Sequence, residues 1–412
     1  MKTYVVGGAV RDELLGLPIV DRDHVVVGST PQQMIDAGFK PVGRDFPVFL
    51  HPDSREEYAL ARTERKVAPG YAGFAFHSAP DVTLEQDLAR RDLTINAIAK
   101  SDTGELIDPY DGQRDLQARV LRHVGPAFVE DPVRILRLAR FAARFTEFSV
   151  AAATLALMQR MVASGEVDAL VAERVWQELS RGLMERKPSR MFALLQDCGA
   201  LARVLPELSP MSMPTMQAID ASADSPASSL AVRFTVLVLS MPLGDGSPRT
   251  DRVNALAKRI RAPVELRDLA LLACAEQSVI AAADTISADK LVSLLERCDS
   301  FRKPLRLLEL LDALSIAHAT NTGAISVEQA AESINQAHQQ LRLALAAATA
   351  VDAGTVARAA TANPANSADR VDPAGLATPV IAGERIKQAI HVARVAAVEQ
   401  ALATIAQSRQ LR

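Results

Sequence analysis

The stretch TYVVGGAVRDELLGLPIVDRDHVVVGS, residues 3–29, decides the fold because its periodicity changes repeatedly over a short distance. The β-branched run TYVV predicts a strand, Gly7-Gly8 a turn, AVRDELLG a helix, and DRDHVVVGS a second strand. Farther along, PQQMIDAG has a helical pattern, whereas PVFLHP and EEYALAR have strand patterns. This order predicts a small mixed-sheet head over residues 1–125.

Strand patterns stop near Asp131, and helical periodicity replaces them in DPVRILRLARFAARF and ERVWQELSRGLM. We therefore expect an α+β chain with a helical neck at residues 126–207 and a helical body and tail at residues 208–412. Proline and serine collect over residues 208–229, which favours a boundary there. Residues 344–378 are rich in alanine with scattered Asn, Pro, Asp and Gly, a composition that predicts a flexible insertion.

Composition narrows the class of protein. The 412 residues carry a formal net charge of -3, so contact with a nucleic acid would depend on local basic patches. The first residues hold charge and glycine where a signal peptide needs an apolar run, and no uncharged stretch is long enough to cross a bilayer. We expect a cytoplasmic protein that makes no membrane contact.

Asp21 and Asp23 lie two residues apart at the head of the second predicted strand. Because side chains alternate along a strand, both carboxylates would point to the same face. Carboxylate oxygens are the ligands that Mg²⁺ prefers, and the ion keeps open positions for water and phosphate. Such a pair often occurs by chance, so its surroundings decide its meaning.

Two nearby features support a phosphate site. Gly7-Gly8 leaves backbone N–H groups exposed at a helix N-terminus, and Arg11 adds a fork of donors. Glu57 lies on a strand that could pair with the strand of Asp23, where its carboxylate could bind metal or act as a general base. Glu56 is adjacent, and the spacing alone does not choose between the two.

Five motifs then occur in order, namely GGAVRD at 7–12, DRD at 21–23, RRDLTINAIA at 90–99, DPYDGQRDL at 108–116 and EDPVRILRLARFAAR at 130–144. Together they resemble the motif series of the class II tRNA nucleotidyltransferases, and most closely the bacterial CCA-adding enzymes. The resemblance is strong over about the first half of the chain and looser beyond it. It implies a polymerase-β-like head, Mg²⁺ as cofactor, CTP and ATP as substrates, and the acceptor arm and 3′ end of tRNA as partner.

The resemblance also implies a role for each matching residue. Asp21 and Asp23 would bind magnesium, and Glu57 would be a third strand carboxylate. Gly8, Arg11 and Arg91 would contact the nucleotide, while Asp92 and Asn96 would fix its sugar. Glu130, Asp131 and Arg134 would read the base, and Arg137 and Arg140 would contact the triphosphate.

Helix geometry supports the last motif independently. At 100° per residue, Arg134, Arg137, Arg140 and Arg144 fall within an arc of about 120°. Asp131 precedes Arg134 by three residues and Glu130 by four, so either carboxylate could orient that arginine. An oriented pair offers acceptors and donors that match the Watson–Crick edge of cytosine or adenine. A solvated, salt-bridged face is the common alternative, but four arginines without a lysine favour phosphate recognition.

We therefore expect a monomeric CCA-adding enzyme. None of the seven histidines precedes an aspartate, so we expect no HD-type phosphohydrolase site, and no P-loop sequence occurs. The alternatives are a bacterial poly(A) polymerase, an enzyme that adds only CC or only A, and an inactive RNA-binding scaffold. Poly(A) polymerases often carry basic terminal extensions, whereas this chain begins at its first predicted strand. Candidate basic elements for tRNA are Arg186-Lys187-Arg190, Arg252 with Lys258-Arg259-Arg261, and Arg302-Lys303-Arg306.

Overall fold

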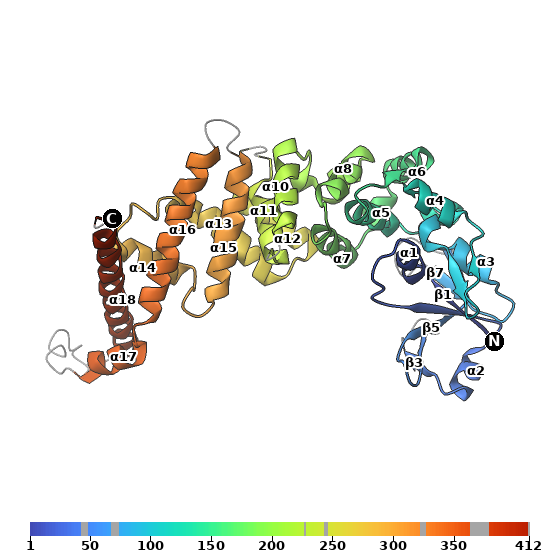
Figure 1. Ribbon diagram of the computed structural model, residues 1–412, viewed down its shortest axis with the longest axis horizontal. Helices are drawn as coiled ribbons and strands as arrows, with labels where there is room; N and C mark the ends of the chain where they lie inside the picture. The colour runs from blue at the N-terminus through green and yellow to red at the C-terminus, as the bar shows by residue number, and fades with distance from the viewer. Residues whose placement is uncertain are drawn as a thin grey trace. The chain divides into compact units, whose positions relative to one another are not determined.

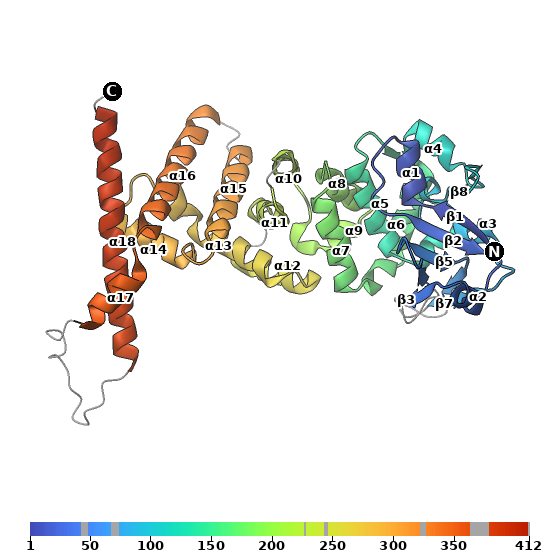
Figure 2. The same cartoon turned by 60° about the horizontal axis from the view of Figure 1, so that its bottom comes forward.

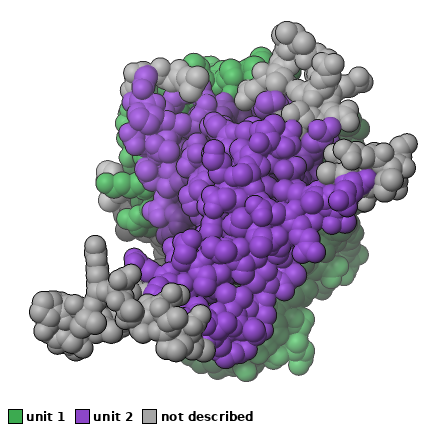
Figure 3. Space-filling view, turned by 90° about the vertical axis from the view of Figure 1, so that its left-hand side faces the viewer, with its two compact units in different colours: residues 1–224, 255–262 green, residues 225–254, 263–412 purple. Residues whose placement is uncertain are grey.

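The computed structural model describes residues 1–42, 48–66, 74–225, 228–242, 246–321, 327–362 and 379–410 (Figures 1 and 2). The described chain forms two compact units, residues 1–224 with 255–262 and residues 225–254 with 263–412 (Figure 3). The predicted α+β class is confirmed. The division into head, neck and body at residues 125 and 207 stays a prediction.

The first unit begins with a mixed sheet in the strand order β3-β4-β5-β2-β1-β8-β9. Its strands are β1 (Lys2–Val6), β2 (Asp23–Val27), β3 (Lys40–Val42), β4 (Val48–Leu50), β5 (Glu57–Leu60), β8 (Ala99–Ser101) and β9 (Leu106–Ile107). The helices among these strands are α1 (Gly8–Leu14), α2 (Pro31–Asp36), α3 (Leu84–Ala89) and the short 3-10 helix η1 (Thr94–Asn96). β6 (Thr63–Lys66) pairs antiparallel with β7 (Phe74–His77) in a separate two-stranded sheet.

The pairing of β2 decides which side chains share a face. β2 runs antiparallel to β1 and parallel to β5, with Asp23 opposite Glu57 and His24 opposite Tyr58. Val25 packs with Val6 and Leu88 in one hydrophobic cluster, whereas Val26 packs with Met34 and Phe49 in another. The alternation of strand side chains thus places Asp23 on the face opposite α2.

Helices dominate the first unit after the sheet. They are α4 (Gly112–Ala118), η2 (Pro126–Glu130), α5 (Val133–Arg144), α6 (Ala152–Ala163), η3 (Glu166–Ala169), α7 (Ala172–Leu183), α8 (Ser189–Asp197), α9 (Ala200–Val204), η4 (Pro206–Leu208) and α10 (Met213–Asp224), with the short strands β10 (Val120–Leu121) and β11 (Ser149–Val150). α5 is the central helix and packs against α7 and α8 (Figure 1). Its apolar side chains, including Ile135 and Leu138, are fully buried, which leaves its arginine face to form a site.

The second unit consists of helices. They are α11 (Leu230–Leu239), α13 (Val264–Ala281), α14 (Ala288–Arg297), α15 (Pro304–Asn321), α16 (Val327–Thr349), α17 (Ala353–Ala362) and α18 (Pro379–Gln410), while α12 (Arg249–Ile260) is shared between the units. Leu291, Leu295, Leu310 and Leu311 are fully buried in its core.

The prediction of a flexible insertion at residues 344–378 is wrong for residues 344–362. Residues 344–349 complete α16 and residues 353–362 form α17, and the side chains of Ala344 and Ala348 are fully buried. Alanine has the highest helix propensity of the residues, so a stretch rich in it extends a helix once its small side chains find a packed surface. Residues 363–378 lie outside the described residues.

No single helix in the described ranges is long and apolar enough to cross a membrane. The segments Asn335–Thr349 and Ala353–Thr361, bent by 54° at their junction, meet the length and composition criteria only as a pair.

Candidate active site

A cavity of about 560 Å³ opens between the sheet and α5 in the first unit. Among the described residues, nine arginines and three aspartates line it, which gives it a strongly positive field. We call it the arginine cavity, and its lining is Gly7, Gly8, Arg11, Asp23, Arg62, Arg90, Arg91, Asp92, Asn96, Asp131, Arg134, Arg137, Arg140, Phe141, Arg144 and Arg174.

Gly7 and Gly8 form the turn from β1 into α1 at one wall of this cavity. Gly7 has φ of +73°, and its N–H donates to the carbonyl of Ile98 at 3.1 Å. A Cβ added to Gly7 would stand 2.6 Å from Nη1 of Arg91, so the arginine occupies space that only glycine leaves. Burial lowers the pKa of Arg91, whose Nε has no hydrogen-bond partner among the described atoms.

A chain of hydrogen bonds connects α5 to α1. Arg137 Nε donates to Asp92 Oδ2 at 2.8 Å, and Asn96 Nδ2 donates to Asp92 Oδ1 at 3.0 Å. Arg11 Nη1 then donates to Asn96 Oδ1 at 2.6 Å. Burial would raise the pKa of Asp92, but the charge of Arg137 and the hydrogen bond from Asn96 bring it well below its usual range. The same ion pair raises the pKa of Arg137.

The chain continues back to α5 through Asp12. Arg11 Nε donates to Asp12 Oδ1 at 2.9 Å, and Arg144 Nη2 donates to Asp12 Oδ2 at 3.0 Å. The guanidinium of Arg11 also lies 5.2 Å from the ring centroid of Phe141, within cation–π range. Arg11, which would contact phosphate, is therefore held from three sides.

Arg140 is fixed differently from the other arginines of α5. Its Nε donates to Glu178 Oε2 of α7 at 2.6 Å, and Glu185 lies 3.8 Å from Nη1. Burial raises the pKa of Glu185. This pairing fixes the guanidinium of Arg140 at the wall of the cavity.

Asp87 of α3 anchors two further arginines of the cavity. Its side chain is 0% exposed and accepts from Arg90 Nη2 at 2.7 Å, Arg91 Nη2 at 3.4 Å and the backbone N–H of Arg62 at 3.3 Å. Burial would raise the pKa of Asp87, but the charges of Arg90 and Arg91 outweigh it and leave that pKa below its usual range. Sequence reasoning missed this residue, although it stands three residues before the RRD motif at 90–92.

Asp131, one of the two carboxylates expected to orient Arg134, pairs with a different arginine. The Asp131 carboxylate accepts two hydrogen bonds from Arg174 of α7, at 3.0 and 2.7 Å. Arg134 instead donates to the carbonyls of Ala127 at 2.8 Å and Arg90 at 2.6 Å. The side chain of Arg134 thus donates to backbone carbonyls of η2 and of the residue that follows α3.

A second cavity of about 710 Å³, the strand-edge cavity, adjoins the start of β2. Its lining is Ile19, Val20, Asp21, Arg22, Asp23, Ser54, Arg55, Glu56 and Glu57. Asp23 lines both cavities. β2 begins at Asp23, so Asp21 lies two residues before the strand rather than in it.

The strand register chooses between Glu56 and Glu57. Glu57 is paired with Asp23 in the parallel ladder, so both side chains point to the same face. Glu56 points to the other face, where its Oε2 lies 3.3 Å from His24 Nε2. Glu57 is therefore the carboxylate that faces the same side as Asp23.

Asp21 and Asp23 suit a magnesium ion. Both carboxylates are exposed, and within the described ranges neither forms a hydrogen bond or ion pair that would compete for a cation. No group of three or more His, Cys, Asp or Glu side chains in those ranges could hold a metal ion, but Mg²⁺ is commonly held by one or two carboxylates with water and substrate phosphates.

The arginine cavity brings together ten of the thirteen residues that the sequence singles out. These are Gly8, Arg11, Asp23, Arg91, Asp92, Asn96, Asp131, Arg134, Arg137 and Arg140. Asp21 and Glu57 line the strand-edge cavity, and Glu130 lines neither cavity. Sequence reasoning missed Arg62, Arg90 and Arg174, and for Arg174 the sequence carries no signal beyond a helical pattern.

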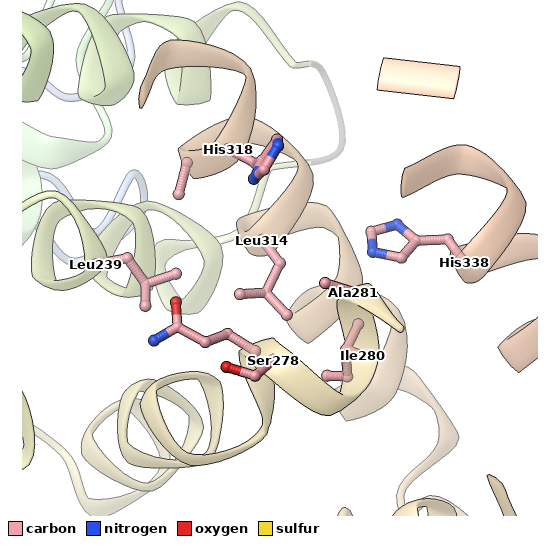
Figure 4. A pocket seen from close by; sticks show the side chains of 9 residues that line it. Leu239, Ser278, Ile280, Ala281, Leu314, His318 and His338 are labelled. Atoms are coloured by element: carbon pink, nitrogen blue, oxygen red, sulfur yellow. The ribbon is translucent and has the colours of Figure 1, made fainter. Parts of the chain in front are cut away.

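The second unit has a cavity of its own, of about 250 Å³, which we call the histidine cavity. Figure 4 shows His318 of α15 and His338 of α16 at its wall, with Leu239, Ile280 and Leu314 among the apolar side chains. Burial lowers the pKa of His338 to about 4, and its Nδ1 lies 3.0 Å from the hydroxyl of Ser315. A neutral, hydrogen-bonded imidazole of this kind is typical of a packed core. The expected absence of phosphohydrolase activity stays a prediction.

Two family models match the chain. The model described as "Poly A polymerase head domain" matches residues 3–122, and "Probable RNA and SrmB- binding site of polymerase A" matches residues 147–212. Among solved structures, a CCA-adding enzyme of Bacillus stearothermophilus in complex with CTP has a TM-score of 0.68 at 21% identity, covering 99% of this chain and 93% of that one. A CCA-adding enzyme in complex with ATP has a TM-score of 0.64 at 20% identity, covering 98% and 90%. These structures share the fold.

Curated relatives are much closer in sequence. The multifunctional CCA protein of Burkholderia multivorans is 52% identical over 98% of this chain and 99% of its own length. That of Burkholderia cenocepacia is 51% identical over the same shares. The alignment extends through both units. The chain belongs to the family of multifunctional CCA proteins.

Proposed function

We propose that this chain adds and repairs the 3′-terminal CCA of tRNA from CTP and ATP, without a nucleic-acid template, and releases pyrophosphate. The observation that carries the proposal is the arginine cavity, in which Asp131, the arginines of α5 and Asp23 face one space. A base reader, a triphosphate clamp and a metal carboxylate in one cavity are what nucleotide transfer to an RNA end requires.

The triphosphate lies, in this proposal, against Gly8 and the guanidiniums of Arg11, Arg137 and Arg140. Their positions are fixed by hydrogen bonds to Asp12, Asp92 and Glu178, so little reorganisation should accompany binding. Asp92 and Asn96, which are both buried, face the same cavity and supply polar groups for the ribose. Arginine suits this task because its planar fork matches phosphate oxygens.

Asp21 and Asp23 are the residues that would hold Mg²⁺. When bound, such an ion neutralises charge on the phosphates and on the leaving pyrophosphate. The α-phosphate then lies next to Asp23, and the 3′-hydroxyl of tRNA approaches from the strand-edge cavity. Glu57, which lines that cavity on the same face as Asp23, is positioned to accept the hydroxyl proton.

The test is to incubate the protein with tRNA that ends at the discriminator base, supply CTP and ATP separately and together, and sequence the products. We expect two cytidines with CTP alone and complete CCA with both nucleotides. A long A tail would indicate a poly(A) polymerase, and products that stop at CC or gain only A would indicate a partial enzyme. Either result contradicts the proposal.

Replacing Asp21 with alanine tests the metal site. We expect Asp21→Ala to lower the rate of transfer by at least about a hundredfold, because one metal ligand is lost. Affinity for tRNA should be nearly unchanged, since the side chain of Asp21 is exposed and its removal should not disturb the fold. Asp36→Ala, an exposed carboxylate at the end of α2, is the matched control and should transfer normally. If Asp21→Ala transfers nucleotides at the wild-type rate, Asp21 is not a metal ligand.

We also propose that the protein acts in the cytoplasm as a monomer. Size-exclusion chromatography with light scattering measures the second point, and a stable dimer would contradict it.

A further inference from the structure

We infer that Arg174 is a positioning residue for base selection, because it holds the carboxylate of Asp131 in one orientation. The inference rests on the proposed function, in which Asp131 reads the incoming base. It gives Asp131 a partner on α7, whereas the sequence motif would pair Asp131 or Glu130 with Arg134 of α5.

The contact between the two side chains is two-pronged. Arg174 Nη1 donates to Asp131 Oδ1 at 3.0 Å, and Nη2 donates to Oδ2 at 2.7 Å. The backbone N–H of Val133 adds a third hydrogen bond to Oδ1, at 3.1 Å. Rotation of the carboxylate about its terminal bond would break all three contacts, so its plane is fixed.

Both partners remain open to a ligand. The side chain of Asp131 is 17% exposed and that of Arg174 is 26% exposed, and both line the arginine cavity. Each carboxylate oxygen can accept two hydrogen bonds, and Oδ2 accepts only one within the described residues. The pair can therefore accept a further donor from the cavity side without separating.

The side chain of Arg134 is directed away from the task of orienting the Asp131 carboxylate. Its two terminal nitrogens donate to the carbonyls of Ala127 and Arg90, and the residue is only 7% exposed. These bonds connect α5 to η2 and to the end of α3. Arg134 is thus directed at the backbone of the head, and Arg174 is the arginine that determines where the Asp131 oxygens point.

Orientation matters for base selection because all four bases carry donors. Cytosine and adenine each present an amino group beside a ring nitrogen that accepts, whereas uracil and guanine present a ring N–H beside a carbonyl. A carboxylate that could turn freely would also accept from the ring N–H of uracil or guanine. A fixed carboxylate accepts only at the position of the amino group, so its partner contributes to the rejection of UTP and GTP.

The experiment compares Arg174→Lys and Arg174→Ala with wild type, and uses Arg181→Ala as a matched control. Arg181 lies on the same helix and is exposed, so its loss removes the same charge away from the cavity. kcat and KM are measured for CTP and UTP with tRNA ending at the discriminator base, together with the melting temperature and the affinity for tRNA.

We expect both Arg174 variants to lose roughly tenfold or more of the CTP-over-UTP ratio of kcat/KM, the scale of a lost hydrogen-bonded discrimination. Lysine keeps the charge but cannot form the two-pronged contact. Arg174→Lys should therefore have a KM for CTP close to that of wild type, but it should still use UTP as Arg174→Ala does. Arg181→Ala should discriminate as wild type does. The affinity for tRNA should be unchanged in all variants.

Wild-type discrimination by Arg174→Lys would overturn the inference, because charge alone would then be sufficient. If Arg174→Ala does not fold, Arg174→Lys decides the matter. The proposed function fails separately, when the wild-type enzyme does not add CCA. In that case the ratio of CTP to UTP binding constants, measured by calorimetry without tRNA, still tests the role of Arg174.

Discussion

At the scale of single residues, Gly7 illustrates how a missing side chain serves the site. We expect Gly7→Ala to displace Arg91, because the new Cβ would stand 2.6 Å from Nη1, and to raise the KM for CTP and ATP at least tenfold. The backbone at φ +73° and ψ -127°, which side chains other than glycine rarely adopt, adds a stability cost of about 1–3 kcal/mol. Steady-state kinetics and thermal unfolding measure the two effects.

Gly16→Ala is the control for that prediction. Gly16 has φ of +66°, but a Cβ there meets no atom within 4 Å. Gly16→Ala should therefore lose about 1 kcal/mol of stability and keep the wild-type KM. Equal KM values for the two variants would show that displacement of Arg91 does not affect nucleotide binding.

The buried carboxylate of Asp87, which pairs with Arg90 and Arg91, should contribute to the stability of the fold. Asp87→Asn leaves Arg90 and Arg91 without their carboxylate, and breaking a buried pair in this way costs about 3 kcal/mol or more at pH 7. Because the folded-state pKa of Asp87 is lowered, its contribution is fully present above the unfolded value near 3.9 and is lost as pH falls through the folded value.

Urea unfolding at several pH values measures this contribution. The difference in unfolding free energy between wild type and Asp87→Asn should be constant from pH 7 to pH 5 and shrink only below about pH 4. Asp102→Asn, an exposed carboxylate in a turn, should be neutral throughout. A difference that already shrinks between pH 7 and pH 5 would contradict the lowered pKa.

Side chains that act through local spacing could be predicted, and those that act across helices could not. Gly8 and Arg11 stand in the turn and helix that follow β1, and Asp23 begins β2, where the local backbone pattern determines their positions. Asp21, expected in the same strand as Asp23, precedes it by two residues. Asp131 and Arg174 are 43 residues apart and meet only because α7 packs beside α5. No local rule specifies which of several arginines a carboxylate will choose when helices cross.

At the scale of elements, α18 is held to α14 by a polar clasp. His391 Nδ1 lies 3.1 Å from Glu296 Oε2, and Nε2 lies 3.0 Å from Asp289 Oδ1. Arg394 lies 3.7 Å from Glu296, and its guanidinium is 3.6 Å from the ring centroid of Phe301. The contribution of the clasp therefore depends on the charge of His391.

The clasp should weaken as pH rises. The hydrogen bond to Asp289 raises the pKa of His391, so its stabilising contribution is fully present below the unfolded value near 6.5 and is lost as pH rises through the folded value. Hydrogen exchange in residues 384–398 should accelerate between pH 6 and pH 8.5, after correction for intrinsic exchange. His391→Gln should remove that dependence, and exchange in α11 serves as the internal reference. An unchanged pH response in His391→Gln would contradict the clasp.

Sequence predicts a helix with a continuous apolar face more readily than a helix that depends on burial against a partner. The alanine-rich residues 344–362 contain turn-forming Asp and Gly, yet they form the end of α16 and all of α17. Composition carries no information about the buried surface that receives Ala344 and Ala348. Periodicity, by contrast, correctly placed α5 with its arginines on one side, because its opposite side is continuously apolar.

At the scale of the whole molecule, a net charge of -3 must coexist with binding of a polyanion. Several of the basic residues that the sequence suggests for tRNA binding form hydrogen bonds or ion pairs within the protein. Arg190 donates to the carbonyls of Phe145, Thr146 and Phe148, and Arg259 pairs with Glu207. Lys187, three residues before Arg190, is exposed.

These neighbours should therefore respond differently to mutation. We expect Lys187→Ala to weaken tRNA binding and to reduce the slope of log affinity against log salt by about 1, without changing the melting temperature. Arg190→Ala should leave that slope unchanged and lower the melting temperature, because three carbonyls lose their donor. Filter binding over a salt series and calorimetry measure the two quantities. An unchanged salt slope in Lys187→Ala would show that Lys187 does not contact a tRNA phosphate.

The hydrogen-bonded path that leaves α5 at Arg137 and returns to it at Arg144 has a mechanical consequence. The two residues are seven positions apart, about 10.5 Å along the axis, and both are tied to the head. A rotation of α5 against the head would break both ion pairs together, one to Asp92 ahead of η1 and one to Asp12 of α1, so α5 and the head should move as one rigid body. The exchange of CTP for ATP after two additions then calls for a hinge elsewhere, or for a change at the RNA end itself.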